Sequence, residues 1–186
     1  MTLRRTGTRK PVCKGSVVKR TICKTTIRKT TVSKQTECKP VSRKKCTRAR
    51  FKKSAFAAIS GIDQTLTNGV FSKVQYQVEE LDLNNEYNSA TSTFRPKQNG
   101  VYTLVASVAF EQITMTPVRM DLEIRVNGVP RITDQENFTP RTGIIDASGI
   151  VQLKVRDRVE VFARATGENG DIQSGVATRF EGARIN

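Results

Sequence analysis

Positive charge is concentrated in the first 53 residues of this 186-residue chain, and this asymmetry limits what each part can fold into. Residues 1–53 contain nineteen Lys and Arg but a single acid, Glu37, whereas residues 54–186 contain thirteen bases and sixteen acids. The net charge of +15 therefore combines about +18 in the first part with about −3 in the second. A segment with so much like charge and so few apolar residues cannot bury a core. We therefore divide the chain into a basic arm (residues 1–53) and a head (residues 54–186).

The basic arm carries an imperfect ten-residue repeat. Similar tetrapeptides begin at Pro11 (Pro-Val-Cys-Lys), Thr21 (Thr-Ile-Cys-Lys) and Thr31 (Thr-Val-Ser-Lys). Thr, Val and Ile favour extended chain, although the apolar area is too small for a core. We expect the arm to be extended or disordered until a partner orders it.

Cations recur every two or three residues along the arm, as in segments that bind a polyanion by releasing its counterions. DNA, RNA, a wall polymer and an acidic protein lattice are candidate partners, and the alternative is a solvated arm that aids solubility or assembly. Sequence-specific nucleic-acid recognition is disfavoured because residues 1–50 contain no aromatic side chain to stack on a base. The candidate contacts are Arg9, Lys10, Lys14, Lys19, Arg20, Lys24, Arg28, Lys29, Arg43, Lys44, Lys45, Arg48, Arg50, Lys52 and Lys53.

All four cysteines lie in the arm, at Cys13, Cys23, Cys38 and Cys46. Their spacings of ten, fifteen and eight residues lack the close pair of a zinc site. Neighbouring cations favour the reactive thiolate, so we consider these residues candidates for disulfide cross-links between arms or chains. Unreactive reduced thiols are the alternative, and the sequence does not choose among the three intrachain pairings.

The head has a different sequence pattern, in which short segments of alternating apolar and polar residues are separated by turn dipeptides. In residues 120–126 Met, Leu, Ile and Val alternate with Asp, Glu and Arg, and residues 151–156 repeat this pattern. Asn-Gly dipeptides begin at Asn68, Asn99, Asn127 and Asn169. These features predict a domain of short β-strands without an amphipathic helix.

In the run Val101–Phe110 the residues pointing to either face of a strand would be apolar or small, which predicts that both faces are covered. One cover is expected to be a second sheet and the other is left open, with a neighbouring subunit as a candidate. Phe162 stands between Glu160 and Arg164 on a face expected to be wet. The residues expected to approach a neighbouring subunit are Tyr102, Phe110 and Phe162.

A spaced set of head residues follows the signature F-x5-[ND]-x4-[FYWL]-x6-F-x5-G-x-Y-x-F-x-[FY]. The matching positions are Tyr76, Asp82, Tyr87, Phe94, Gly100, Tyr102, Leu104 and Ala106. Phe180 and Gly182 belong to a segment that looks like the last strand of the same family. On these residues the head resembles the C1q-like domain of the C1q/tumour-necrosis-factor superfamily, and residues 81–94 are similar to the heads of collagen-like proteins on Bacillus spores.

The resemblance implies an all-β, jelly-roll β-sandwich that assembles as a homotrimer, preceded here by the extended or disordered basic arm. Leu104 and Ala106 replace two aromatic residues, so we expect a core repacked around smaller groups. Gly100 is expected at a turn that requires positive φ, and the Tyr102 hydroxyl is expected to find a hydrogen-bond partner in the core. The signature residues are expected to specify packing and no chemistry.

The sequence favours a structural protein over an enzyme. The chain contains no His, which removes the commonest general base and metal ligand, and we expect neither catalysis nor a cofactor. The acid pairs Asp82 with Glu86 and Asp157 with Glu160 are expected to be solvated.

The chain has no apolar run long enough to cross a membrane and no export signal at its start. The resemblance implies a trimeric head of a kind found outside cells. Taken with the missing export signal, it implies display on a bacterial spore layer or phage particle that is released by lysis. The arm would anchor it to an anionic or Cys-containing lattice. The alternative is a nucleic-acid-binding or capsid-decorating protein in which the arm is the functional part.

Overall fold

The computed structural model describes residues 17–27, 34–44, 53–112, 114–139 and 141–185. The chain divides into two compact units, Met1–Phe51 and Lys52–Asn186. The first unit contains residues 1–51 of the arm, and the second contains Lys52, Lys53 and the head with its own hydrophobic core.

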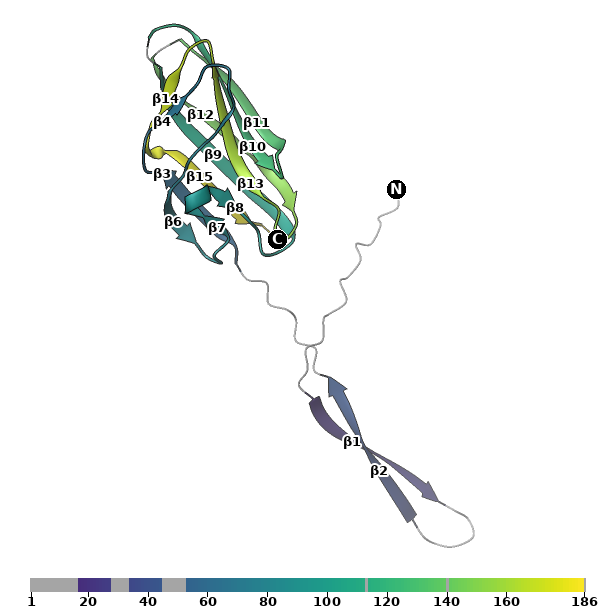
Figure 1. Ribbon diagram of the computed structural model, residues 1–186. Coiled ribbons are helices and arrows are strands. Elements are labelled where there is room, and N and C mark those ends of the chain that lie inside the picture. The colour runs from purple at the N-terminus through teal and green to yellow at the C-terminus, as the bar shows by residue number, and fades with distance from the viewer. Residues whose placement is uncertain (1–16, 28–33, 45–52, 113, 140, 186) are drawn as a thin grey trace, which may run out of the picture. The chain divides into compact units, whose positions relative to one another are not determined.

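The arm contains a β-hairpin of two long strands, β1 (Val17–Ile27) and β2 (Lys34–Lys44) (Figure 1). Eleven residues of each strand pair antiparallel without a shift of register, from Val17 opposite Lys44 to Ile27 opposite Lys34. The Thr, Val and Ile of the repeat favour this extended backbone. Pro40 is tolerated because both strands of a two-stranded sheet are edge strands. We call these two strands the basic hairpin.

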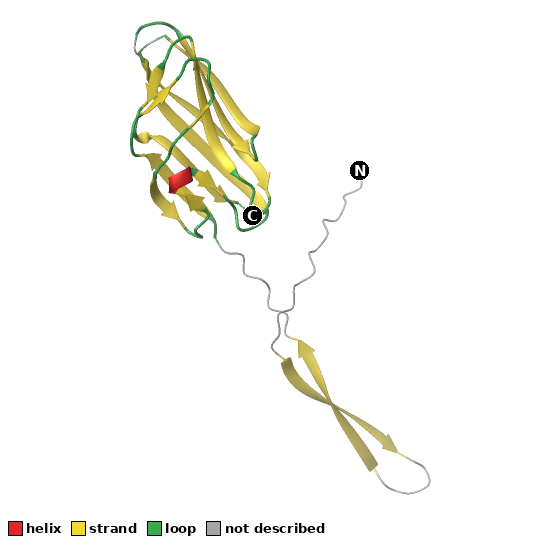
Figure 2. Cartoon of the chain, viewed as in Figure 1, coloured by secondary structure: helices red, strands yellow, loops and turns green. Residues whose placement is uncertain are grey.

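The head is built almost entirely of strands, as Figure 2 shows, with one short 3₁₀ helix, η1 (Ser89–Thr91). In chain order the strands are β3 (Ala55–Ser60), β4 (Gln64–Leu66), β5 (Ser72–Lys73), β6 (Val78–Asp82), β7 (Tyr87–Asn88), β8 (Thr93–Phe94), β9 (Gly100–Gln112), β10 (Val118–Val126), β11 (Val129–Phe138), β12 (Thr142–Leu153), β13 (Val159–Thr166), β14 (Gly170–Ile172) and β15 (Gly175–Arg184).

The head strands form two sheets. One sheet has six strands in the order β11-β10-β13-β8-β7, with β5 also paired to β13. The other has seven in the order β4-β14-β9-β15-β3-β6, with β12 paired to the free side of β9. Strands that are adjacent in space are often distant in sequence; β15, for example, lies between β9 and β3. Two packed sheets with such connections form the jelly-roll sandwich that was expected.

The alternation in residues 118–126 has its expected structural consequence. Met120, Leu122 and Ile124 are fully buried, while Glu123 and Arg125 point to the outer side of the six-stranded sheet. The turn to β11 has two residues, Asn127 and Gly128, both with positive φ, as a tight hairpin requires.

An aromatic cluster fills the core at one end of the sandwich. Phe56 stacks on Phe94 at 4.3 Å and on Tyr87 at 5.3 Å between ring centroids, and it meets the edge of Phe180 at 4.8 Å. Tyr102 packs against Phe94 and donates its hydroxyl to the carbonyl of Gln98 at 2.9 Å. The predicted hydroxyl partner of Tyr102 is therefore present, and the aromatic signature residues pack together.

The aromatic cluster can pack this closely because residue 182 is a glycine. A Cβ at this position would lie 2.7 Å from Leu104 Cδ2 and 2.8 Å from Phe56 Cε1. Real Cβ contacts are not this short, so any larger side chain would displace the ring or the leucine.

Two local expectations were wrong. Gly100 has no positive φ, because it already belongs to β9, where it pairs with Leu153. The strand expected over residues 151–156 ends at Leu153, and Arg156 adopts a positive φ of 71° in the turn that follows.

Among the described residues, no helix has the length and apolar character needed to span a bilayer.

Candidate interaction surfaces

The outer side of the seven-stranded sheet carries small and apolar side chains along its long central strand. In β9 the even-numbered residues Tyr102 to Phe110 are buried in the core, so the odd-numbered residues face outward. These are Val101, Thr103, Val105, Ser107, Ala109 and Glu111. Since the free face of an antiparallel sheet is normally polar, this composition marks the face as unusual.

The neighbouring strands continue this surface. Thr103 lies opposite Ala183 on one side and Ile150 on the other, and Ala109 lies opposite Ile144. Beyond β15, Ala55 and Ala57 of β3 face outward, and Ala57 pairs with Leu81 of β6. We call the outward residues of β3, β9, β12 and β15, together with Leu81, the apolar face.

The apolar face combines a shallow hollow with exposed large side chains. The hollow has a volume of about 230 Å³ and exists because alanines occupy the outward positions around it. Its lining includes Ala55, Ala57, Leu81, Thr103, Val105 and Ala183. Ile144 and Ile150, on β12, are 51% and 69% exposed. The outward positions between these two isoleucines are Asp146 and Ser148. Exposed apolar side chains gathered on one face are a signal of an interaction site.

A small charge cluster lies on the β6 and β15 part of the apolar face. Arg179 Nη2 lies 2.7 Å from Glu181 Oε2 and 3.6 Å from Glu80 Oε2. All three side chains are more than a third exposed, so the cluster adds polarity and little stability.

The outer side of the six-stranded sheet carries mostly charged side chains. Its outward positions on β10 are Arg119, Asp121, Glu123 and Arg125, and on β13 they are Glu160, Phe162, Arg164 and Thr166. We call these eight residues the charged face.

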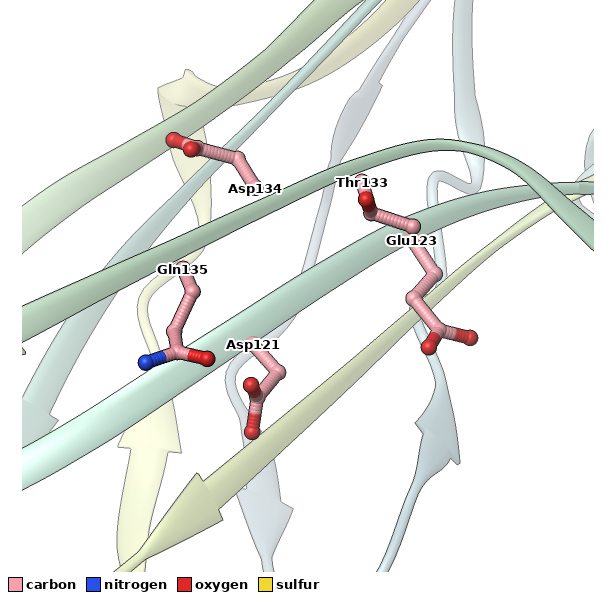
Figure 3. A pocket seen from close by; sticks show the side chains of 5 residues that line it. All are labelled: Asp121, Glu123, Thr133, Asp134 and Gln135. Atoms are coloured by element: carbon pink, nitrogen blue, oxygen red, sulfur yellow. The ribbon is translucent and has the colours of Figure 1, made fainter.

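Charges on this face are paired within the chain. Asp121 Oδ2 lies 3.0 Å from Arg164 Nη2, and Glu123 Oε2 lies 2.6 Å from Arg125 Nε. Figure 3 shows that Asp121 and Glu123 line a polar hollow with Thr133, Asp134 and Gln135 of β11. Two of the acids that line this hollow, Asp121 and Glu123, already have cationic partners within the chain.

Phe162 is covered by an arginine of its own chain. The Arg125 guanidinium lies 4.1 Å from the Phe162 ring centroid and 4.8 Å from that of Phe71, and Arg164 lies 4.3 Å from Phe71. These cation–π contacts explain how an aromatic residue can occupy the charged face.

Of the three residues expected to approach a neighbouring subunit, two are enclosed by their own chain and one is on an outward face. Tyr102 and Phe110 are buried in the core of their own chain, and Phe162 lies on the charged face under Arg125. The physical reason is size: the large side chains of β9 fill the core, and its small ones face outward. The side of this strand that points away from the core therefore belongs to the apolar face.

The acid pair Asp157 with Glu160 has a structural role. Asp157 accepts hydrogen bonds from Asn127 Nδ2 at 3.0 Å and the Lys154 backbone N–H at 2.8 Å. Glu160 is buried and lies 2.6 Å from Lys73 Nζ and 2.8 Å from Arg158 Nε. Burial acts to raise the pKa of Glu160, but the hydrogen bond and charge of Lys73, with the charge of Arg158, outweigh it and hold the pKa below its ordinary value.

Asp82 and Glu86 hold the backbone where the head begins. Asp82 accepts from the backbone N–H of Tyr87 at 2.7 Å. Glu86 is buried and accepts from the Ser54 hydroxyl and the Lys97 backbone N–H, each at 2.5 Å. The expectation that these acids are solvated is wrong for Glu86 and Glu160, because each has partners inside the fold.

In the part of the chain that the structure describes, no group of three or more His, Cys, Asp or Glu residues is placed to hold a metal ion.

The basic hairpin contains five of the predicted polyanion contacts. Lys19, Arg20 and Lys24 lie on β1, and Arg43 and Lys44 lie on β2. With Lys34 and Lys39, the two strands carry seven cations and one acid. Lys53, the last residue of the arm, is exposed. The remaining predicted contacts lie outside the described residues: Arg9, Lys10, Lys14, Arg28, Lys29, Lys45, Arg48, Arg50 and Lys52.

Two of the four cysteines belong to the hairpin. Cys23 of β1 lies directly opposite Cys38 of β2 in the backbone register. Cys13 and Cys46 lie outside the described residues.

Two features of the head were not predicted from sequence. Phe56, at the centre of the aromatic cluster, lies among Ala55, Ala57, Ala58 and Ile59, where no polar residue marks the alternation. The sequence predicted that both faces of Val101–Phe110 are covered, but it did not predict that β3, β12 and β15 extend the outward face of β9 into a wider surface.

Comparison with known proteins supports the fold and gives no closer assignment. No model of a known protein family matches this sequence, and no curated protein sequence matches it. The structure is similar to the globular domain of zebrafish complement 1qA protein, with 16% identity and a TM-score of 0.50 over 72% of this chain and 98% of that one.

Two further solved structures are similar. One is murine APRIL at pH 5.0, with 14% identity and a TM-score of 0.55 over 72% of this chain and 100% of that one. The other is Eiger TNF from S. frugiperda, with 9% identity and a TM-score of 0.53 over 73% of this chain and 94% of that one. The chain therefore contains a jelly-roll domain with the fold of the C1q and tumour-necrosis-factor domains.

Proposed function

We propose that this chain is a non-enzymatic structural protein, in which the head assembles with two further copies and the basic arm docks on an anionic surface. The observation that carries the first half is the contrast between the two outer faces of the sandwich. One face combines small and apolar side chains and exposed isoleucines with a few charges, and the other consists mainly of paired charges.

The apolar face suits a second copy of the same chain. Its hollow is lined mainly by small residues together with Leu81 and Glu181, and the small residues let another sheet or strand approach closely. Burying Ile144, Ile150 and Leu81 removes apolar area from water, which drives association. The C1q-like resemblance, in which the domain forms homotrimers, favours three copies.

Covalent footprinting with hydroxyl radicals tests which face is covered in the full-length protein. Ile144, on the apolar face, and Val129, on the six-stranded sheet, are both 51% exposed in the single chain. They form a matched pair of aliphatic reporters. We expect several-fold less labelling at Ile144 than at Val129; equal labelling would contradict assembly through the apolar face.

The arm supplies the second half of the proposed function. Its charge of about +18 contrasts with about −3 for the head, so attraction to a polyanion is a property of the arm. The seven cations of the basic hairpin lie on a regular extended backbone, which spaces them along an anionic surface.

Salt-dependent binding of the full-length chain tests the arm. We expect Lys19, Arg20, Arg43 and Lys44, changed together to Gln, to reduce the slope of log affinity against log salt by about 3 to 4, since each phosphate contact contributes about 0.9. A matched control changes four exposed head cations to Gln, namely Arg95, Arg131, Lys154 and Arg156. An equal reduction in both variants would show that the arm is not the binding element.

The identity of the polyanion decides between two functions. Similar affinity for duplex DNA and for inorganic polyphosphate supports a lattice anchor. A marked preference for DNA supports the alternative, a nucleic-acid-binding protein whose head gathers several arms. Within the anchor function we propose display on a spore layer or virus particle, which immunogold labelling of intact particles from the source organism would detect at the surface.

A further inference from the structure

The backbone register of the basic hairpin brings two cysteines together. Cys23 is the seventh residue of β1 and Cys38 the fifth of β2, and they occupy directly opposite positions. The register runs through all eleven pairs without a bulge, so this alignment is fixed along the whole ribbon.

Directly opposite residues in an antiparallel pair suit a disulfide. Their Cα atoms lie about 4.5 or 5.5 Å apart, depending on whether the pair is hydrogen-bonded. Disulfide-linked residues have Cα separations of about 4.4–6.8 Å, so a bond at this position needs no displacement of the strands.

Without a cross-link, the basic hairpin is expected to be unstable. A two-stranded sheet by itself is only marginally stable in water. Here seven cations and a single acid share the two strands, and their mutual repulsion favours separation. The pair Lys24 opposite Glu37 is the only one of the eleven that joins opposite charges.

We propose that Cys23 and Cys38 form an intrachain disulfide that holds the basic hairpin closed. The oxidant is a small-molecule disulfide such as oxidised glutathione. One cysteine thiolate attacks a sulfur of this disulfide and releases one small thiol; the other then attacks the protein-bound sulfur and releases the second. The two protein sulfurs are oxidised, the small disulfide is reduced to two thiols, and these thiols carry the two protons.

This pairing limits how the four cysteines can be used. Of the three complete intrachain pairings, only the one that joins Cys13 to Cys46 is compatible with a Cys23–Cys38 bond. Cross-links to other chains then depend on Cys13 and Cys46 alone. The inference does not rest on the proposed function, because it concerns a bond within one chain.

Peptide mapping of the full-length protein tests the pairing. The protein is equilibrated in oxidised and reduced glutathione, remaining thiols are alkylated, and the chain is digested with trypsin. Because trypsin spares Lys-Pro bonds, each cysteine falls in a different peptide: Lys10–Lys14, Thr21–Lys24, Gln35–Arg43 and Cys46–Arg48. We expect about nine tenths of Cys23 in a linked Thr21–Lys24/Gln35–Arg43 product, because the register gives this pair the highest effective concentration.

Two controls make the result decisive. A mixture of ¹⁴N- and ¹⁵N-labelled protein must give linked peptides of a single isotope, and mixed-isotope products would place the bond between chains. The double variant Cys13→Ser/Cys46→Ser must keep the linked product. Alkylated Cys23 and Cys38, or a bond from either one to Cys13 or Cys46 as the main product, would overturn the proposal.

Discussion

At the scale of single residues, Gly182 shows how one position permits the aromatic core. Its missing side chain leaves the space taken by Phe56 and Leu104, and the Thr103 carbonyl lies 3.0 Å from the position of a Cβ. We predict that Gly182→Ala destabilises the head by about 1–3 kcal/mol through overpacking. Thermal unfolding at one protein concentration measures this.

Val176→Ala on the same strand is the matched control for Gly182→Ala. Val176 is exposed, so its truncation is expected to change stability by no more than about 0.5 kcal/mol. Equal effects of the two substitutions would contradict the packing role of Gly182.

The three tyrosines give a second prediction at this scale. Burial raises the pKa of Tyr76, Tyr87 and Tyr102 above the ordinary value. Their hydroxyls donate to the backbone carbonyls of Ser107, Tyr76 and Gln98 respectively. A raised pKa in the folded state stabilises the protein below the unfolded value of about 10, and this contribution is lost as pH rises through the folded pKa.

The alkaline titration should therefore follow unfolding. The chain has three Tyr and no Trp, so its near-ultraviolet absorbance reports these residues directly. We expect less tyrosinate in the folded protein than in the unfolded chain near pH 10, with the rest appearing at higher pH together with loss of circular dichroism. In urea the same residues should titrate near pH 10; a similar titration of the folded protein would show that they are solvated.

At the scale of elements, the strands that the sequence predicted best were those with one solvent-exposed face. The alternation of residues 120–126 predicted β10 because its polar positions contrast with its buried ones. β9 gave no such contrast, because its odd-numbered and even-numbered residues are both apolar or small. The large aromatic residues Tyr102 and Phe110 were expected to point toward a neighbouring subunit, whereas both are buried in the core of their own chain. Only the partner sheet decides that Tyr102 and Phe110 face inward.

Other elements depended on tertiary contacts that local sequence does not encode. β12 begins at Thr142, well before the alternation expected from residue 151, because its whole length pairs with β9. The hairpin in the arm was anticipated only as extended chain, since a repeat of Thr, Val and Ile favours strands without specifying their register.

The two outer faces predict different responses to the same substitution. Ile144→Glu places a charge on the apolar face, whereas Val129→Glu places one at an equally exposed position on the six-stranded sheet. We expect Ile144→Glu to weaken assembly because the charge would be desolvated at the contact. Sedimentation velocity measures the change, and circular dichroism checks that the fold is kept. Val129→Glu should leave assembly unchanged, and dissociation in both variants would contradict the assignment of the face.

At the scale of the whole molecule, the chain joins a nearly neutral head to a strongly basic arm. Self-association of the head would bring several arms of about +18 into one particle, and their joint binding to an anionic surface would exceed that of a single arm by avidity. The charge asymmetry was evident from the sequence. Assembly depends on which side chains remain outside after folding, and this became visible only in the structure.

The most direct measurement is the mass of the full-length protein by light scattering, with reductant to remove disulfide cross-links and salt to screen the arms. Trimeric assembly through the apolar face predicts three times the chain mass of 20.7 kDa, independent of concentration over the range measured. A single-chain mass under the same conditions would contradict it.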